Sequence, residues 1–125
     1  MKQYLFFILC FSIWTNVSGN DTLHYRVKTQ LLSELNVTYI EATLCQKTFS
    51  TKYYLDIDFG QETQFFNNKD KRICDISGQY IEFASRISAI NYLVKLGYEI
   101  FDHQYMFDGD GNISGQRILL KKIKE

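Results

Sequence analysis

The sequence has no excess of charge of either sign, no long hydrophobic run and few of the residues that usually hold metal ions. Its 125 residues contain 14 Lys and Arg and 14 Asp and Glu. This balance argues against the basic surface with which proteins bind nucleic acid. With only two His and no C-x-x-C pair, the chain offers no recognisable metal site, and we expect neither metal nor cofactor. A glycine-rich phosphate loop and a G-x-S-x-G element are also missing, so no enzyme class stands out.

The longest apolar run lies at the start of the chain and is too short to cross a membrane. It extends from Tyr4 to Trp14, about 11 residues, whereas a membrane-spanning helix needs roughly 20. Lys2 precedes the run, and small residues ending in Gly19 follow it. This three-part order predicts a secretory signal peptide over residues 1–19. We therefore expect an exported protein, located in the periplasm or at the cell surface, with no transmembrane anchor after signal cleavage.

The rest of the chain is long enough for one domain but not for two. Residues 20–38 combine strand-like alternation with helix-like spacing, and we interpret them as an N-terminal arm. Residues 39–125 are predicted to form a single domain. Alternating or β-branched patterns predict strands at 39–46, 53–59, 72–76, 79–83, 98–107 and 116–123. Turns are expected at 48–51, at Ser77-Gly78 and at 108–115.

One helix is predicted between Ser85, a favourable N-cap residue, and Gly97, a favourable residue just after a helix end. Apolar residues follow each other at helical spacing between these two positions. Strands that surround a single helix indicate the α+β class. We expect an antiparallel sheet of four to six strands with one helix packed on a face.

Two cysteines, Cys45 and Cys74, are left once the signal is removed. In an oxidising compartment they are candidates for a disulfide. Such a bond would stabilise the fold by roughly 3 to 4 kcal/mol in the chain-entropy model. The alternative is two separately buried thiols, because a free cysteine packs as a small hydrophobic residue. The sequence leaves both alternatives open.

Three polar residues are candidates for acid–base chemistry. Asp56 and Asp58 lie on the same face of a predicted strand, and His103 lies on another strand. Paired carboxylates act as acid and base when their surroundings raise one pKa. The alternative is that the two carboxylates form the solvated face of an amphipathic strand, and we favour this alternative. The Asp108–Ser114 segment resembles a calcium loop, but Met106 and Arg117 stand where the first and last carboxylates belong, so we predict a plain hairpin turn.

Aromatic residues are abundant, with nine Tyr and ten Phe. Phe65 and Phe66 lie in a polar loop, and Tyr54 and Tyr105 lie on predicted strands. These four are the candidate binding residues, because exposed aromatic rings form platforms for glycans or peptides. The alternative is that such rings fill a thin core between sheet and helix.

Four stretches together resemble a group of small, uncharacterised exported proteins from Bacteroides-type bacteria. They are Asp56–Gln61, Ala89–Leu93, Leu96–Glu99 and Leu119–Lys122. In that group the junction after the helix usually reads Gly-Trp-Glu, and here Tyr98 replaces the Trp. The resemblance covers roughly residues 39–124 and implies a fold and an exported location, without an activity.

The function that we expect from these observations is a non-enzymatic binding or interaction module of the cell envelope. Its partner would be an envelope protein, a peptide or a glycan, bound at a sheet edge or at the Phe65–Phe66 loop. Two alternatives stay open. One is a small periplasmic hydrolase that uses Asp56, Asp58 or His103. The other is a structural accessory subunit of an envelope complex.

Overall fold

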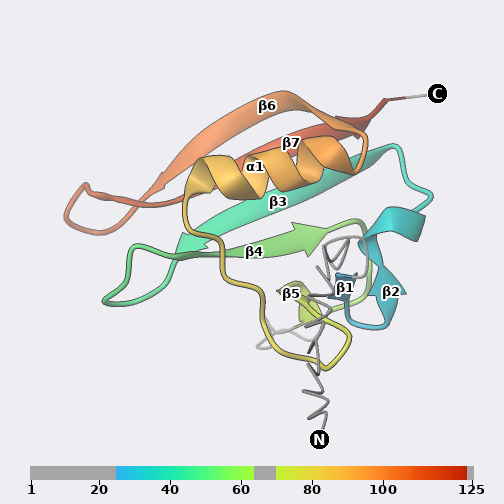
Figure 1. The fold of residues 1–125 in the computed structure, drawn as a ribbon. Helices are drawn as coiled ribbons and strands as arrows, with labels where there is room; N and C mark the ends of the chain where they lie inside the picture. Colours follow the sequence, from blue (N-terminus) through green and yellow to red (C-terminus); the bar gives the residue numbers. More distant parts are fainter. Residues whose placement is uncertain (1–24, 64–69, 124–125) are drawn as a thin grey trace, which may run out of the picture.

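A four-stranded antiparallel sheet covered on one face by a helix forms the centre of the computed structural model, which describes residues 25–63 and 70–123 (Figure 1). The strand order is β4-β3-β7-β6. The elements are β3 (Tyr39–Gln46), β4 (Tyr53–Asp58), α1 (Arg86–Lys95), β6 (Tyr98–Phe107) and β7 (Ile113–Lys122). This arrangement confirms the predicted α+β class. None of the helices in the described part of the chain is long and apolar enough to span a membrane.

A second, smaller sheet accompanies the first, although the sequence predicted only one sheet. Its order is β2-β1-β5, with β1 at Arg26–Val27, β2 at Gln30–Leu31 and β5 at Ile73–Cys74. A 3-10 helix, η2, follows at Leu32–Glu34. Strands of two residues are too short to show a period. The pairing of β1 with β5 also joins segments far apart in the sequence, so local patterns do not reveal it.

The region between residues 72 and 83 is less regular than predicted. The sequence predicted two strands joined by a two-residue turn, whereas only Ile73–Cys74 is a strand, and the turn spans 75–78. The Asp75 carboxylate explains the difference, because it accepts backbone N–H bonds from Ser77 at 2.8 Å and Gln79 at 3.0 Å. A side chain that binds the nearby backbone competes with the strand ladder and shortens it.

The core lies between the four-stranded sheet and α1. Alternation in β3 and β4 places every second side chain on this side, and the register sets Leu44 opposite Leu55 and Ala42 opposite Ile57. Ala89 and Leu93 of α1 pack against these residues, fully buried. Burial of each large aliphatic side chain contributes roughly 1.5 to 3 kcal/mol. The helix therefore holds to the sheet through one apolar stripe.

The two ends of α1 carry the predicted signals. At its start, Ser85 and Ser88 form a reciprocal capping pair, in which each hydroxyl accepts the other's backbone N–H at 3.1 Å. Such caps are worth about 1 kcal/mol. At its end, Gly97 has a φ of 87°, a conformation that other residues adopt only with strain. The chain thereby turns from the helix directly into β6.

The two outer strands of the main sheet differ in how their edges are covered. Tyr53 of β4 exchanges two backbone hydrogen bonds with Phe83, at 2.9 and 2.8 Å, and Ile57 donates to the Lys71 carbonyl at 2.7 Å. The segment 71–83 therefore closes the β4 edge. On β6, no strand in the described ranges pairs with the side that faces away from β7. Eight of its ten residues are exposed.

Candidate functional site

The most developed polar cluster surrounds Arg72, on the face of β4 that points away from α1. The guanidinium of Arg72 donates to both carboxylate oxygens of Asp56, from Nε at 2.8 Å and from a terminal nitrogen at 3.3 Å. The same group lies 4.4 Å from the ring centre of Tyr54 and 5.6 Å from that of Tyr80. Asp56 raises the pKa of Arg72 further. A two-point ion pair flanked by two aromatic rings is a rigid arrangement.

Further ion pairs lie on both sides of this cluster. Lys71 binds Asp58, and its hydrogen bond is the main reason why the pKa of Asp58 is below its ordinary value. Glu82 binds Lys47 and also Lys52, the latter at 3.2 Å. These two lysines likewise lower the pKa of Glu82. Each of these carboxylates is thus held as an anion, which is the opposite of what a general acid at neutral pH requires.

These contacts assign the cluster a structural role. Asp56 and Asp58 of β4 bind two neighbouring cations of the segment 71–83, and so hold that segment along the β4 edge. Tyr54, one of the predicted binding residues, contributes its ring to Arg72 and its hydroxyl to Glu82 at 3.4 Å. Its ring face is therefore already occupied by a cation of the same chain.

The structure does not bring the candidate catalytic residues together. Asp56 lies on β4 and His103 on β6, at opposite sides of the β4-β3-β7-β6 sheet. Three strand spacings separate them, about 14 Å. They also face opposite ways: Asp56 is on the Arg72 side, whereas His103 is opposite Ile118, which is buried beneath α1. No proton passes directly between groups placed in this way.

Tyr105 lies beside His103, and their rings meet edge to face at 5.9 Å. Arg86 at the start of α1 approaches the Tyr105 ring at 5.9 Å. The two predicted aromatic sites, Tyr54 and Tyr105, therefore belong to different edges and different faces of the sheet. They do not form one platform. The other two predicted binding residues, Phe65 and Phe66, lie outside the described residues.

Both cysteines are free thiols in the structure, and they lie on different sheets. Burial raises the pKa of Cys45, and nearby Asp56 raises it further. Burial also raises the pKa of Cys74. At neutral pH both thiols are therefore protonated and are weak nucleophiles. The candidate disulfide between them, which the sequence left open beside two separate thiols, stays open.

Phe49 is an exposed residue that sequence reasoning missed. It lies at the tip of the β3–β4 hairpin, fully exposed, with a positive φ of 55°. The Ser50 N–H donates to the Lys47 carbonyl at 3.1 Å, which closes a four-residue turn around it. Glycine or asparagine suits such a position. The only sequence signal was one Phe inside an otherwise polar turn.

The hairpin between β6 and β7 forms the plain turn that was predicted. The Asp108 carboxylate accepts backbone N–H bonds from Asp110 at 3.0 Å and Asn112 at 2.9 Å. These bonds satisfy the carboxylate locally and lower its pKa. Across residues 25–63 and 70–123, no three His, Cys, Asp or Glu side chains converge as metal ligands would.

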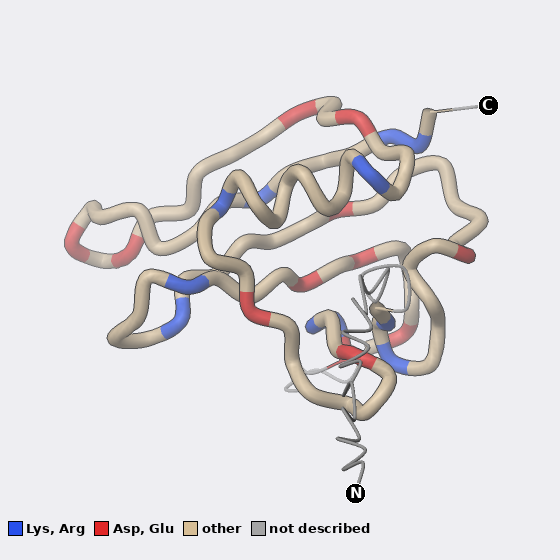
Figure 2. The backbone as a smooth tube through the Cα atoms, in the orientation of Figure 1, with Lys and Arg blue, Asp and Glu red and all other residues tan. Residues whose placement is uncertain are grey.

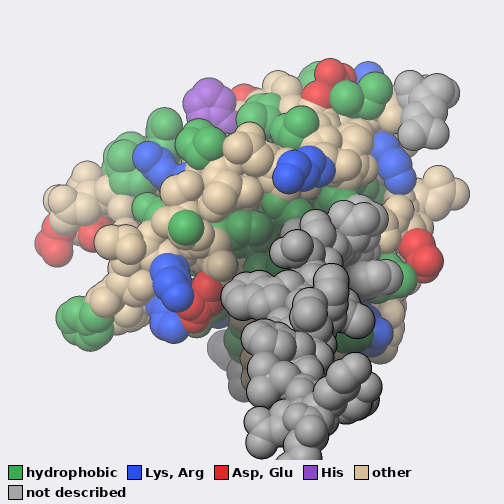
Figure 3. Space-filling model, in the orientation of Figure 1, with side chains coloured by type: hydrophobic (Ala, Val, Ile, Leu, Met, Phe, Trp, Pro, Cys, Tyr) green, Lys and Arg blue, Asp and Glu red, His purple; other side chains and the backbone are tan. Residues whose placement is uncertain are grey.

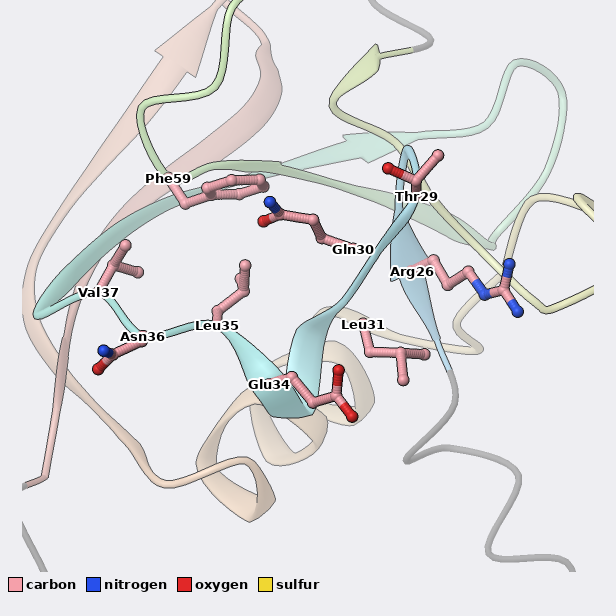
Figure 4. Close-up of a pocket in the computed structure, with 9 residues that line it drawn as sticks. All are labelled: Arg26, Thr29, Gln30, Leu31, Glu34, Leu35, Asn36, Val37 and Phe59. Carbon is pink, nitrogen blue, oxygen red and sulfur yellow. The ribbon is translucent and has the colours of Figure 1, made fainter.

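An open depression of about 720 Å³ lies between the small sheet and the end of β4 (Figure 4). Figure 4 shows the Gln30 side chain directed toward the Phe59 ring, with Leu35 below them, while the Arg26 guanidinium points to the other side. The lining is mixed, with Gln30, Glu34 and Asn36 beside apolar residues such as Leu35 and Phe59. Ligand sites of this size are ordinarily enclosed, whereas this depression is open.

Comparison with known proteins identified no relative of this chain. No family model matches the chain, and no similar protein was found among the curated proteins or the solved structures. The function must therefore be argued from the geometry of the molecule.

Proposed function

We propose that this protein is a non-enzymatic interaction module of the cell envelope that binds a protein partner by strand addition at β6. Signal-like residues 1–19 support the exported location. In strand addition, an extended segment of the partner pairs with an exposed sheet edge through main-chain hydrogen bonds.

The observation that carries the proposal is the difference between the two edges of the main sheet. The β4 edge is closed by backbone bonds and by the ion pairs of Asp56 and Asp58, whereas β6 has no partner strand on its outer side within the described chain. A long, uncovered edge strand invites pairing with another chain. Native proteins therefore usually keep edge strands short, place charges on them or cover them. Here the edge strand has ten residues, and Ile100, Phe101 and Phe107 are 47%, 62% and 63% exposed.

Hydrophobic side chains gather along the same region in the space-filling view (Figure 3). Phe101 packs edge to face on Tyr39 at 5.9 Å, on the face away from α1, while Tyr105 lies on the α1 face. An added strand would therefore find aromatic surface on both faces next to the open backbone. Side-chain contacts of this kind supply specificity, and the backbone bonds supply affinity.

The hydrolase alternative receives no support from the geometry, since Asp56, Asp58 and His103 are separated and the two carboxylates are ion-paired. The accessory-subunit alternative has no observation that favours it over a binding module. We therefore develop the binding proposal alone.

Crosslinked capture followed by hydrogen exchange tests the proposal. Tagged protein is crosslinked in its native envelope, the captured partner is identified, and the complex is rebuilt from purified components. Strand addition should slow amide exchange within 98–107 and leave β4 unchanged. The variant Tyr105→Lys should capture much less partner, because an edge lysine opposes pairing. Val94→Lys, an equally exposed change on α1, is the matched control. A complex in which β6 amides exchange as in the free protein would refute strand addition.

The export part of the proposal has its own test. Intact-mass measurement of protein recovered from the producing cell should show a chain that begins after residue 19. Alkylation before the measurement also reports whether Cys45 and Cys74 are bonded. A recovered chain that retains residues 1–19 would overturn the exported location.

A further inference from the structure

The register of β6 against β7 divides the open edge into two chemically different sides. Directly opposed residues of an antiparallel pair share a face of the sheet. Ile100, His103 and Tyr105 are opposite residues that are buried under α1. These three side chains therefore lie on the α1 side. Glu99 and Asp102 are opposite Lys121 and Leu119, on the other side.

The side away from α1 carries two carboxylates, Glu99 and Asp102, beside the Phe101 ring that packs on Tyr39. The acidic residues of β6 are Glu99 and Asp102, and Figure 2 shows red positions along this strand. Neither carboxylate forms an ion pair with any residue of 25–63 or 70–123, although Lys121 is opposite Glu99 in the register. Arg117, the other cation of β7 on this side, is 3.3 Å from Glu41. Glu99 is therefore available to a cation brought by a neighbouring strand. Asp102 is also without a cation, although its carboxylate accepts the backbone N–H of His103 at 2.8 Å.

The side facing α1 is apolar and aromatic. Ile100 is 47% exposed and Tyr105 is 41% exposed, and the His103 ring lies between them against Tyr105. No Lys or Arg occurs within β6 itself. A neighbouring strand that places apolar side chains here would cover these rings.

Two irregularities limit how long the added strand can be. The β6–β7 register shifts between Ile100 and Asp102, with Phe101 as the extra residue, and shifts again between Met106 and Phe107. Bulges twist an edge and interrupt pairing. The regular part of the edge is therefore 102–106, with Glu99 just before it.

We propose that the partner supplies a short strand, about five residues long, in which basic and apolar side chains alternate. The basic residues face the Glu99–Asp102 side, and the apolar residues cover His103 and Tyr105. This inference rests on the proposed function, since it names the chemistry of the partner at the same edge. A second copy of β6 fits less well, because it would bring acidic residues alongside acidic residues.

Synthetic peptides and amide NMR test this inference. The probe is acetyl-Thr-Lys-Val-Lys-Phe-Lys-Thr-amide. One control has Glu in place of each Lys, and another has the same composition with the three Lys consecutive. Each peptide is titrated into the mature protein, and the shifts of the 102–106 amides are followed. The alternating Lys peptide should bind at least about fivefold more tightly than either control, given the size of cross-strand charge pairs.

Charge reversal on the protein completes the test. The variant Glu99→Lys/Asp102→Lys should invert the preference, so that the Glu peptide binds more tightly than the Lys peptide. Glu34→Lys/Glu62→Lys changes the net charge equally at two exposed positions outside β6 and its hairpin and should leave the preference unchanged. Thermal melts confirm that all variants are folded.

The outcomes distinguish strand addition at β6 from the proposed chemistry of the partner. If Lys and Glu peptides shift the β6 amides equally, strand addition stands and the basic, alternating partner is wrong. If no peptide perturbs 102–106, strand addition itself falls. If the β6 amides of the peptide-free protein become protected as its concentration rises, a second copy occupies the edge, and the proposed partner is overturned.

Discussion

Replacing Gly115 by alanine should destabilise the fold markedly, because this glycine lies where β3, β6 and β7 approach one another. It is buried, opposite Cys45 of β3 and Met106 of β6. A Cβ at this position would be 2.7 Å from the Leu44 carbonyl oxygen and 2.6 Å from the Met106 methyl carbon. Ordinary contacts begin near 3.4 Å. The Met106 side chain can rotate away, but the Leu44 oxygen belongs to the backbone of the central strand.

The size of the effect follows from these two contacts. Relieving the contact with the oxygen requires β3 and β7 to separate by about 0.7 Å, in the middle of a ladder. Overpacking of this kind costs about 1 to 3 kcal/mol. The loss of backbone freedom in the unfolded chain offsets about 0.4 to 1 kcal/mol of that cost. The midpoints of these two ranges give a net loss of about 1.3 kcal/mol. This loss lowers the melting temperature by about 5 to 10 °C in a domain of this size.

Urea unfolding of the protein, followed by circular dichroism, measures this loss. Gly109→Ala is the matched control, because a Cβ at Gly109 has nothing within 4 Å and its φ is not positive. Met106→Ala/Gly115→Ala should still be less stable than Met106→Ala, since the contact with Leu44 persists. If Gly115→Ala were as stable as Gly109→Ala, the close approach of β3 and β7 at this point would be refuted.

Three further changes test other parts of the structure. Leu93→Ala leaves a cavity in the core and should lower the free energy of unfolding by about 2 to 5 kcal/mol. Val94 is exposed on the same helix, so Val94→Ala should change the free energy of unfolding by less than about 0.5 kcal/mol. Urea titration measures both changes. Phe49→Asn should raise stability by up to about 1 kcal/mol, because asparagine tolerates the positive φ and no packing is lost; a lower unfolding midpoint would contradict this. The hydrogen bond from Lys71 lowers the pKa of Asp58, so the stability that Asp58 contributes is present above its unfolded pKa and is lost as pH falls through its folded pKa. The free energy of unfolding should therefore change less between pH 7 and pH 3 in Asp58→Asn than in the native protein.

Local sequence patterns predicted the regular elements of the main sheet well. The β-branched and apolar pattern in 39–46, the alternation in 53–59 and the capping residues around α1 each act within a few residues of the chain, and the observed strands are 39–46 and 53–58. The β3–β4 turn and the Gly97 junction were also predictable, since turn chemistry is local. The two-residue strands of the small sheet carry no such period, and the Asp75 turn shortened the predicted hairpin through side-chain bonds.

The candidate site was less predictable than the fold. Alternation placed Tyr54, Asp56 and Asp58 on one face, but only the folded chain shows that Lys71 and Arg72 bind those two carboxylates. Tyr105 was a candidate as an aromatic residue on a strand. Its position on an uncovered edge depends on β6 being last in the strand order, which no local pattern specifies.

Local sequence therefore specified the strands of the main sheet, their turns and α1, because side-chain period, capping and turn preferences act over short windows. The tertiary structure alone decided which strands are neighbours and which edge is left open. Those choices depend on burying apolar faces together across long loops, and on the ion pairs that hold 71–83 against β4. The β4 edge is closed because distant residues meet there, and β6 is open because no other described segment reaches it.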